Sequence, residues 1–184
     1  MGSVYERELK GILEGDLELL VRMKKRSGTA QLFGYGVPER YPFMVIRGAG
    51  SFGTDLVALR GEFSFPIEVK SSKDPKMYMS KPYLKEQLAT FTEECKRANT
   101  FPVYAFRLKK AKGDPWKVFT VKVEGLRYFT RTLNGKMTEL RLTDGGNYVM
   151  DWEAGTPLST FLTSLGSILD SIREREAAQT VKVI

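Results

Sequence analysis

Apolar residues recur at helical spacing in three segments of the chain, namely residues 4–25, 83–98 and 157–179. Such spacing predicts amphipathic helices, because an α-helix returns the same face to the core every three to four residues. Gly15-Asp16 lies inside the first segment, and we expect a break in that helix there because both residues favour turns. The other two segments are predicted as uninterrupted helices.

Short runs rich in β-branched and aromatic residues alternate with these helices and predict a sheet. The runs lie at 44–47, 54–60, 63–70, 102–108 and 116–123, with further strands near 126–133 and 137–142. Stretches rich in Gly, Pro or charged residues are predicted as loops, at 26–42, 48–53, 71–82 and 109–114. The helix between the strands 63–70 and 102–108 indicates a crossover. The predicted fold class is therefore α/β, with a mixed central sheet flanked by helices.

Charge and composition narrow the class of protein. The net charge of +7 and the pI near 9.4 favour a polyanionic partner such as nucleic acid, although a positive charge also serves solubility. The absence of histidine excludes Ser-His-Asp and Cys-His catalysis and histidine-ligated zinc, which leaves carboxylates and lysine for chemistry.

A single cysteine, Cys95, excludes an internal disulfide and favours a reducing, cytoplasmic compartment. No apolar run approaches the roughly 20 residues that span a bilayer, so no membrane association is expected.

The residues around Gly61-Glu62 predict a hairpin that brings three charged side chains together. Glycine at the first central position is typical of a two-residue type II′ turn, which pairs the two residues that flank it. Continuing this register places Asp55 opposite Glu68, with Cβ atoms roughly 4.5–5.5 Å apart on one face of the sheet. Lys70 shares that face because side chains alternate along a strand. Asp55, Glu68 and Lys70 are therefore predicted to converge.

Two carboxylates at the end of an apolar hairpin need a partner, because like charges repel and each costs free energy to desolvate. Mg²⁺, or Mn²⁺ in its place, would resolve both problems, because it takes oxygen ligands from carboxylates and backbone carbonyls. The expected ligands are Asp55, Glu68 and the carbonyl of Ile67 or Val69. Lys70 would then orient a water or stabilise negative charge on a phosphate. The alternative is an ordinary hairpin with an exposed ion pair, which contributes little.

The flanks of this hairpin resemble a known nuclease family. Asp55 followed by Glu68-Val69-Lys70 resembles the signature of the PD-(D/E)XK nucleases. Within that superfamily the chain is most similar to the archaeal-type Holliday-junction resolvases, over residues 4–12 and 44–108. That family also carries a Glu-Arg pair in its first helix, an Arg before a Gly/Ser loop, a Gln near the start of a later helix and a basic residue at a strand end. In this chain these motifs are Glu6-Arg7, Arg47 to Ser51, Gln87 and Arg107.

The resemblance implies a restriction-endonuclease-like fold and a role for the matched residues. Glu6 would be a further metal-site acid delivered by the first helix, with Glu8 as its rival for that role. Gln87 would help to orient the water or Lys70. Arg7, Arg47, Ser51 and Arg107 are implied to contact DNA, and Lys73 is expected to do so from the basic segment 70–81. Without the family, these side chains could equally be surface or helix-end charges and loop residues.

The function implied by the resemblance is that of a structure-selective endodeoxyribonuclease, which resolves four-way DNA junctions by paired, Mg²⁺-dependent hydrolysis. Two nicks of like geometry need two like sites, so a C2 homodimer on branched DNA is expected. Another PD-(D/E)XK nuclease, either restriction-like or a repair exonuclease, would use the same site on other DNA. A non-catalytic, basic DNA-binding module is the alternative from a different class.

Two segments depart from the family pattern. Residues 14–42 make the stretch before Arg47 much longer than in the family, which affects the placing of Glu6. Residues 116–184 continue past the family's core, and they could extend a dimer interface, bind DNA or cap the sheet. We expect residues 1–184 to form one nuclease domain, with a core at about 1–110 and a C-terminal extension of strands and a helix at about 111–184.

Overall fold

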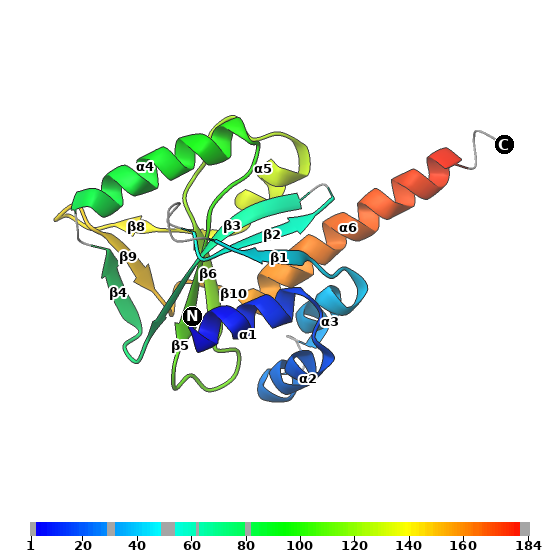
Figure 1. Cartoon of the computed structure of the whole chain (residues 1–184), viewed down its shortest axis with the longest axis horizontal. Coiled ribbons are helices and arrows are strands. Elements are labelled where there is room, and N and C mark those ends of the chain that lie inside the picture. The colour runs from blue at the N-terminus through cyan, green and yellow to red at the C-terminus, as the bar shows by residue number, and fades with distance from the viewer. Residues whose placement is uncertain (1–2, 29–31, 49–53, 62, 80–81, 181–184) are drawn as a thin grey trace.

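The computed structural model describes residues 3–28, 32–48, 54–61, 63–79 and 82–180. These residues form six helices and two sheets (Figure 1). The helices are α1 (Val4–Leu13), α2 (Leu17–Arg26), α3 (Leu32–Arg40), α4 (Pro82–Arg97), α5 (Tyr128–Asn134) and α6 (Leu158–Thr180). The strands are β1 (Met44–Arg47), β2 (Leu56–Arg60), β3 (Phe63–Ser72), β4 (Lys76–Met79), β5 (Val103–Leu108), β6 (Trp116–Thr120), β7 (Thr138–Glu139), β8 (Arg141–Leu142), β9 (Tyr148–Asp151) and β10 (Thr156–Pro157).

The larger sheet is mixed, in the strand order β1-β2-β3-β5-β6-β10, with β7 paired to β6. β1, β2 and β3 are antiparallel neighbours, whereas β3 and β5 run parallel because the chain crosses over through α4 between them. β6 returns antiparallel to β5. The predicted α/β class is therefore confirmed, and the helix expected at 157–179 is present as α6. Like the other described helices, α6 is not long and apolar enough to cross a membrane.

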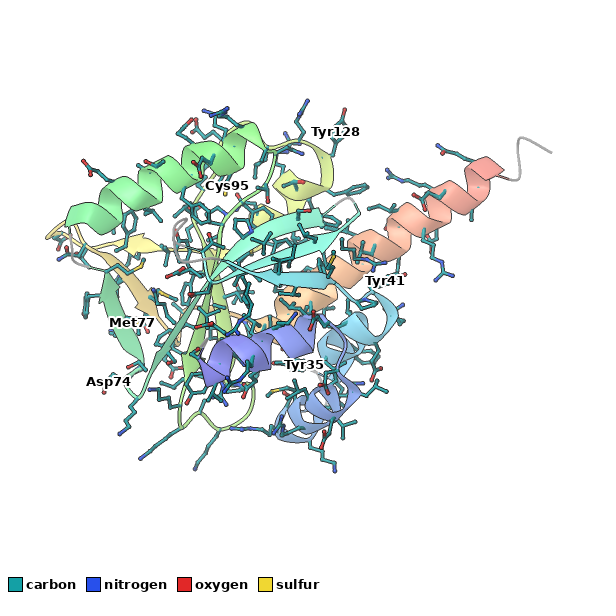
Figure 2. The ribbon with its side chains drawn as sticks, in the orientation of Figure 1. Tyr35, Tyr41, Asp74, Met77, Cys95 and Tyr128 are labelled. Atoms are coloured by element: carbon teal, nitrogen blue, oxygen red, sulfur yellow. The ribbon has the colours of Figure 1, made fainter. Side chains whose placement is uncertain are left out.

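Hydrophobic side chains fill both faces of this sheet (Figure 2). On one face α1, α3 and α6 cover a core in which the ring centroids of Phe65 and Phe161 lie 5.7 Å apart. On the other face α4 and the smaller sheet, β4-β9-β8, enclose a second core around Phe106 and Phe119. In Figure 1 the strands accordingly lie between α4 and the group formed by α1, α2 and α3. Alternation along β3 turns Phe65 into the first core and Glu68 toward the other face.

The hairpin of β2 and β3 has the predicted register. Arg60 pairs with Phe63 across the turn, and the pairing continues to Leu56 and Ile67. Gly61 adopts φ +38°, in the left-handed region where glycine has no Cβ to clash. The register prediction is thus confirmed up to the residue pair beside Asp55 and Glu68.

The first predicted helix is broken as expected, into α1 and α2. Gly15 takes φ +81°, and a Cβ there would lie 2.7 Å from the carbonyl oxygen of Pro38. Asp16 then caps α2, because its Oδ1 accepts a hydrogen bond from the Leu19 N–H at 3.0 Å. The sharp turn between the two helices brings α2 back over α1 and α3.

The predicted loop over 26–42 is wrong, because most of its second half forms α3. Two glycines and Pro38 disfavour a helix there by propensity alone. The helix forms because it packs closely against the start of α6. A Cβ on Gly34 would lie 2.0 Å from the Ser159 carbonyl oxygen, and the Tyr35 side chain is fully buried. Close tertiary packing here overrides local propensity.

Three further predictions of local structure are corrected. Segment 126–133, predicted as a strand, forms the helix α5, in which Thr130, Leu133 and Asn134 are buried at helical spacing. The predicted loop 71–82 contains the end of β3 and all of β4, which pairs with β9. Segment 137–142 forms only the short strands β7 and β8, and β9 and β10 were not predicted. These strands depend on partners far along the chain, which a local residue pattern does not reveal.

Candidate active site

Asp55 directly precedes β2, and its carboxylate reaches the backbone of β3. Its Oδ2 accepts a hydrogen bond from the Val69 N–H at 2.7 Å, and its own N–H donates to the Ile67 carbonyl oxygen at 3.1 Å. The N–H and C=O groups of one strand residue point to the same side, so the Val69 carbonyl faces Asp55 as well. Asp55 and the Val69 carbonyl therefore present oxygen atoms to the same space.

Gly48 holds the end of β1 against Asp55. The Gly48 N–H donates to the Asp55 carbonyl oxygen at 2.9 Å. A Cβ at residue 48 would lie 1.9 Å from the Thr54 carbonyl oxygen, so only glycine permits this approach. The remainder of the predicted loop 48–53, including Ser51, lies outside the described residues.

Glu68 and Lys70 lie together on the α4 face of β3, as the strand alternation predicts. Lys70 Nζ is 2.5 Å from Glu68 Oε1, and both side chains are mostly shielded from solvent. Burial raises the pKa of Glu68 above its ordinary value, and the ion pair with Lys70 opposes this while the charges of Asp55 and Glu6 add to it. The structure therefore gathers three carboxylates near one lysine.

Glu6 is held at the start of α1 by two sets of contacts. Its carboxylate accepts from the Ser3 N–H at 3.0 Å, while the Ser3 hydroxyl accepts from the Glu6 N–H at 3.1 Å, which completes a capping box. Arg47 donates to the other carboxylate oxygen at 3.2 Å. Burial alone would raise the pKa of Glu6, but the hydrogen bonds from Ser3 and Arg47 lower it below its ordinary value. Arg47, at the end of β1, thus links Glu6 to the strand that leads toward Asp55.

Glu8, the rival of Glu6, points into the protein instead. Its Oε1 accepts from Arg107 Nε at 2.9 Å and from Trp116 Nε1 at 2.8 Å. The Arg107 side chain is buried, and its guanidinium lies over the Tyr5 ring at 5.5 Å. This corrects the prediction that Arg107 contacts DNA, because a buried, paired guanidinium is not available to a phosphate. Glu8 and Arg107 instead fasten α1 to β5 and β6.

We expect Glu8→Ala to lower the free energy of unfolding by about 3 kcal/mol, because it leaves the charge of Arg107 buried without its partner. The matched control is Glu14→Ala at the C-cap of the same helix, which removes an exposed ion pair with Lys10 and should cost well under about 1 kcal/mol. Urea unfolding curves measure both values. A Glu8→Ala protein as stable as the unchanged chain would contradict the proposed fastening of α1.

The other residues expected to bind DNA or to orient the water are not all described by the structure. Arg7 and Lys73 are exposed, on α1 and in the turn between β3 and β4, and their contacts with DNA stay predictions. Gln87 belongs to α4, but its side chain lies outside the described residues. The carboxylates, Lys70 and Arg47 are thus the site residues that the described structure brings together.

Tyr104 lies beside the site and was not singled out from the sequence. The parallel register of β3 and β5 pairs it directly with Glu68. Burial raises the pKa of the Tyr104 hydroxyl, and the charge of Glu68 raises it further. The hydroxyl therefore keeps its proton beside the carboxylate. Knowing the register of β3 on β5 would have identified Tyr104. That register was not predictable from the sequence, because the two strands are joined only through the α4 crossover.

The donor set at this site fits a hard divalent cation. In the ranges that the structure describes, no three Asp, Glu, Cys or His side chains are arranged to hold a metal ion by themselves. Mg²⁺ does not need such a group, because it is commonly held by one or two carboxylates together with waters and substrate phosphates. Asp55, Glu68 and the Val69 carbonyl are oxygen donors of this kind. A bound cation would also relieve the repulsion that contributes to the raised pKa of Glu68.

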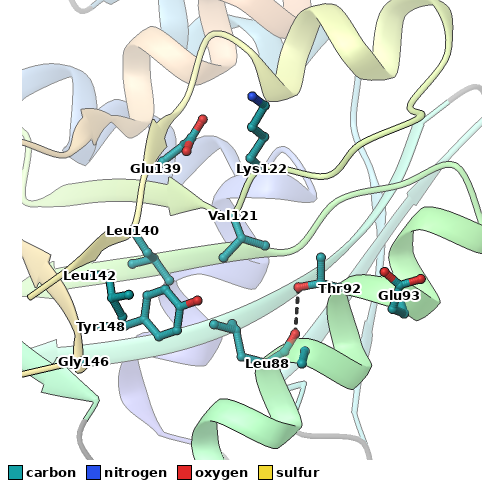
Figure 3. Close-up of a pocket in the computed structure, with 11 residues that line it drawn as sticks. Leu88, Thr92, Glu93, Val121, Lys122, Glu139, Leu140, Leu142, Gly146 and Tyr148 are labelled. Atoms are coloured by element: carbon teal, nitrogen blue, oxygen red, sulfur yellow. Dashed lines mark hydrogen bonds between the residues drawn. The ribbon is translucent and has the colours of Figure 1, made fainter.

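A separate pocket of about 620 Å³ lies between α4 and the strands β7 and β8 (Figure 3). Its wall combines apolar side chains such as Leu88, Val121 and Leu140 with the carboxylate of Glu139. Thr92 is satisfied within α4, because its hydroxyl donates to the Leu88 carbonyl at 2.7 Å. Among the described residues that line this pocket, none is a predicted site residue. It is therefore distinct from the carboxylate site.

The fold and the site together indicate a kind of chemistry. A central hairpin in a mixed sheet brings Asp55, Glu68 and Lys70 to one end of the strands, beside an acidic residue from the first helix. Carboxylates grouped beside a lysine in this way suit metal-assisted hydrolysis of a phosphodiester.

Comparison with known families narrows this kind of chemistry. Residues 39–101 match the family model of the archaeal Holliday junction resolvase (Hjc). The matched segment contains Arg47, Asp55, Glu68 and Lys70, whereas α1, α5 and α6 lie outside it. The match confirms the resemblance predicted from the sequence over residues 44–101, and it does not include Glu6, Arg7 or Arg107. It supports a junction-resolving DNA nuclease and suggests the use of a divalent metal ion.

One of the solved structures that are similar to this chain is Hjc of Archaeoglobus fulgidus, a Holliday junction resolvase from an archaeal hyperthermophile. The likeness has 24% sequence identity and a TM-score of 0.42, and it covers 77% of this chain and 95% of that chain. No match is found among curated proteins.

Proposed function

We propose that this chain is a structure-selective endodeoxyribonuclease that resolves four-way DNA junctions by paired hydrolysis of phosphodiester bonds. The observation that carries the proposal is the group of Asp55, Glu68 and Lys70 at the end of the hairpin, inside the segment that matches the resolvase family. The net charge of +7 and exposed basic residues such as Arg7 and Lys73 suit a DNA substrate. The proposal extends to one nuclease domain over residues 1–184.

Mg²⁺ is the cation proposed for the site, with Mn²⁺ as a substitute. Asp55, Glu68 and the Val69 carbonyl would hold it, and Glu6 would contribute from the helix side, directly or through water. When bound, the cation supplies polarisation of the phosphodiester and a lowered pKa of an attacking water. Exchange of carboxylate for amide should therefore affect the reaction more than it affects DNA binding.

The remaining side chains act on the phosphate and the water. Lys70, 2.5 Å from Glu68, would orient the attacking water or stabilise the charge that develops on the phosphate. Arg47 donates a hydrogen bond to Glu6, and its guanidinium suits a neighbouring phosphate. Arg7, Ser51 and Lys73 are proposed backbone contacts, which position DNA without reading its sequence. Gln87 is proposed to assist the orientation of the water.

A homodimer follows from the proposed reaction. Two nicks of like geometry on opposite strands need two like active sites related by a two-fold axis. Each copy of the chain carries one hairpin site, so a monomer would nick one strand only. The oligomeric state in solution, measured by light scattering with and without a junction, tests this part of the proposal.

Cleavage of a labelled immobile four-way junction, compared with a linear duplex of matched sequence, tests the proposed function. We expect cutting of the junction in Mg²⁺, no cutting in EDTA, and little cutting of the duplex. Equal cutting of both substrates would identify a PD-(D/E)XK nuclease of another kind and would contradict junction selectivity. Tight binding without cutting under Mg²⁺ or Mn²⁺ would leave only a DNA-binding module.

Gly48→Ala provides a test of the backbone approach at the site. We expect roughly a 100-fold loss of cleavage rate, because the added Cβ must push Thr54 and Asp55 away, and a shift of about 1 Å at the reacting groups has such an effect. Gly36→Ala is the matched control: its Cβ would meet nothing within 4 Å, and alanine favours its helix by about 0.5–1 kcal/mol. Unchanged cleavage by Gly48→Ala would show that the approach of β1 to Asp55 is unimportant.

A further inference from the structure

Three arginines and a tyrosine line a pocket outside the active site, where α5 meets α6. The pocket has a volume of about 530 Å³, and none of the described residues that line it is acidic. Apart from Asn99, the residues that line it lie outside residues 39–101, the part of the chain that matches the resolvase family. The side chains that matter are Arg127, Arg131, Arg175, Tyr128, Phe129 and Asn99.

The three arginines of this pocket have no counterion among the described residues. Their guanidinium groups are not within 4.0 Å of a described carboxylate, although exposed acidic residues occur elsewhere on α6. The Arg175 guanidinium lies over the Phe129 ring at 5.5 Å, which fixes it toward α5. Clustered arginines repel one another, and a phosphate relieves that repulsion while accepting bidentate hydrogen bonds. The cluster therefore suits a polyanion.

Tyr128 is presented at this pocket by an unfavourable backbone conformation. Its φ is +51°, in the left-handed region that a bulky residue rarely adopts, and 83% of the residue is exposed. Asn99 also has a positive φ, +52°, and its side-chain oxygen accepts from the Arg127 N–H at 2.9 Å. Figure 2 shows Tyr128 at the outer edge of the molecule. Strain of this kind gathers at ligand-binding positions, and here it displays an aromatic ring beside three cations.

The pocket lies at the opposite end of the hairpin from the active site. Thr100, next to Asn99, donates a hydrogen bond to the Ser64 carbonyl beside the hairpin turn, whereas Asp55 precedes the far end of β2. The length of β2 separates these ends by roughly 15–20 Å, at about 3.3 Å per strand residue. That separation is about half a helical turn of B-DNA, at roughly 34 Å per turn. No single phosphate can reach both positions, but a duplex or the separate arms of a branched DNA can.

We propose that this pocket binds the sugar–phosphate backbone of a DNA duplex, and that it holds an arm of the junction other than the arm being cut. The arginines contact phosphates, and Tyr128 packs against the backbone or an exposed base. The arm assignment rests on the proposed junction-resolving function, whereas binding of DNA by the pocket does not. The pocket would give part of residues 111–184 a DNA-binding role and would favour branched over linear DNA.

The test is a variant that carries Arg127→Gln, Arg131→Gln and Arg175→Gln together. Affinity for an immobile four-way junction and for a linear duplex is measured in EDTA over a series of salt concentrations. We expect about a tenfold or greater loss of junction affinity, and a decrease of about 2–3 in the slope of log affinity against log salt, because each lost phosphate contact contributes about 0.9. The duplex should lose less. Arg173→Gln is the matched control, because it removes an exposed arginine of α6 that does not line the pocket.

The outcomes separate this proposal from the proposed function. Unchanged junction affinity in the triple variant, with cleavage retained by the wild-type chain, would overturn the pocket and leave the nuclease. If the triple variant bound the junction more weakly but the wild-type chain never cleaved it, the pocket would be supported and the nuclease function overturned. Equal losses on junction and duplex would support DNA binding by the pocket and overturn the arm assignment.

Tyr128→Gly keeps the proposal testable if the triple variant does not fold. Glycine accepts the positive φ without strain, and the exposed ring loses little burial, so the unfolding temperature should stay unchanged or rise. Junction affinity should nevertheless fall several-fold, because the aromatic contact is lost. A lower unfolding temperature together with unchanged affinity would show that Tyr128 serves folding, and would contradict its role at the pocket.

Discussion

Replacing Asp55 with asparagine is expected to reduce junction cleavage by roughly 10³-fold or more, while leaving binding of the junction nearly unchanged. Asparagine has the same size and can still accept from the Val69 N–H, so the local structure should persist. It removes one of the two negative charges that the proposed cation needs. The quantities to measure are the single-turnover rate in saturating Mg²⁺ and the affinity for the junction in EDTA.

Asp144→Asn is the matched control for this substitution. Asp144 is exposed in the turn between β8 and β9, so the variant has the same change of charge away from the hairpin. We expect it to cleave at the wild-type rate. Equal cleavage rates of the Asp55→Asn and Asp144→Asn variants would show that Asp55 is not catalytic, and would contradict the proposed metal site.

Lys70→Ala is expected to lower kcat by roughly 10²–10³-fold with little change in KM, because its contact with the phosphate or the water strengthens only as charge develops. Glu68 loses its ion pair in this variant, so its pKa should rise further and cleavage should recover in part at higher pH. Cleavage rates over a pH series and a substrate series separate these effects.

Lys73→Ala supplies the contrast for Lys70→Ala. Lys73 is exposed in the turn after β3 and is proposed to contact only the DNA backbone. Its loss should weaken binding and lower the salt slope by about 1, with kcat retained. If Lys70→Ala behaved in the same way, Lys70 would be a binding residue and its assignment to the chemical step would be wrong.

The hairpin could be predicted from the sequence because its register depends only on nearby residues. Gly61 selects a two-residue turn, and strand alternation then determines which side chains share a face. Asp55, Glu68 and Lys70 are brought together in this way, without any assumption about the rest of the fold. The same local logic found the break at Gly15 and the helix α6, since turn residues and a long apolar stripe are local signals.

Other features of the site depend on contacts that the sequence does not display. Glu6 and Glu8 are two residues apart on α1, and only the pairing of Glu8 with Arg107 shows which of them faces inward. The same contact buries Arg107, which the family pattern alone had assigned to DNA. Tyr104 enters the site through the parallel register of β5 on β3. Each of these relations joins elements that are far apart in the chain.

The errors in secondary structure have the same origin. The glycines and Pro38 of α3 argue against a helix until α6 is packed against them, and Gly34 is then required by the close approach to Ser159. The composition of α5 favours a strand until the burial of Thr130 and Leu133 at helical spacing is known. Tertiary contacts decide such segments, because local propensities differ by less than the free energy of burial.

Mapping the cut positions on an immobile four-way junction tests whether this hairpin site resolves junctions by paired nicks. The wild-type chain, Asp55→Asn and Lys70→Ala are incubated with junctions labelled on each strand in turn, in Mg²⁺ and in EDTA. We expect two nicks, placed symmetrically on opposite strands near the crossover, in Mg²⁺ only and strongly reduced in both variants. Nicks that are unpaired, that persist in EDTA, or that survive both substitutions would contradict a junction-resolving site built on this hairpin.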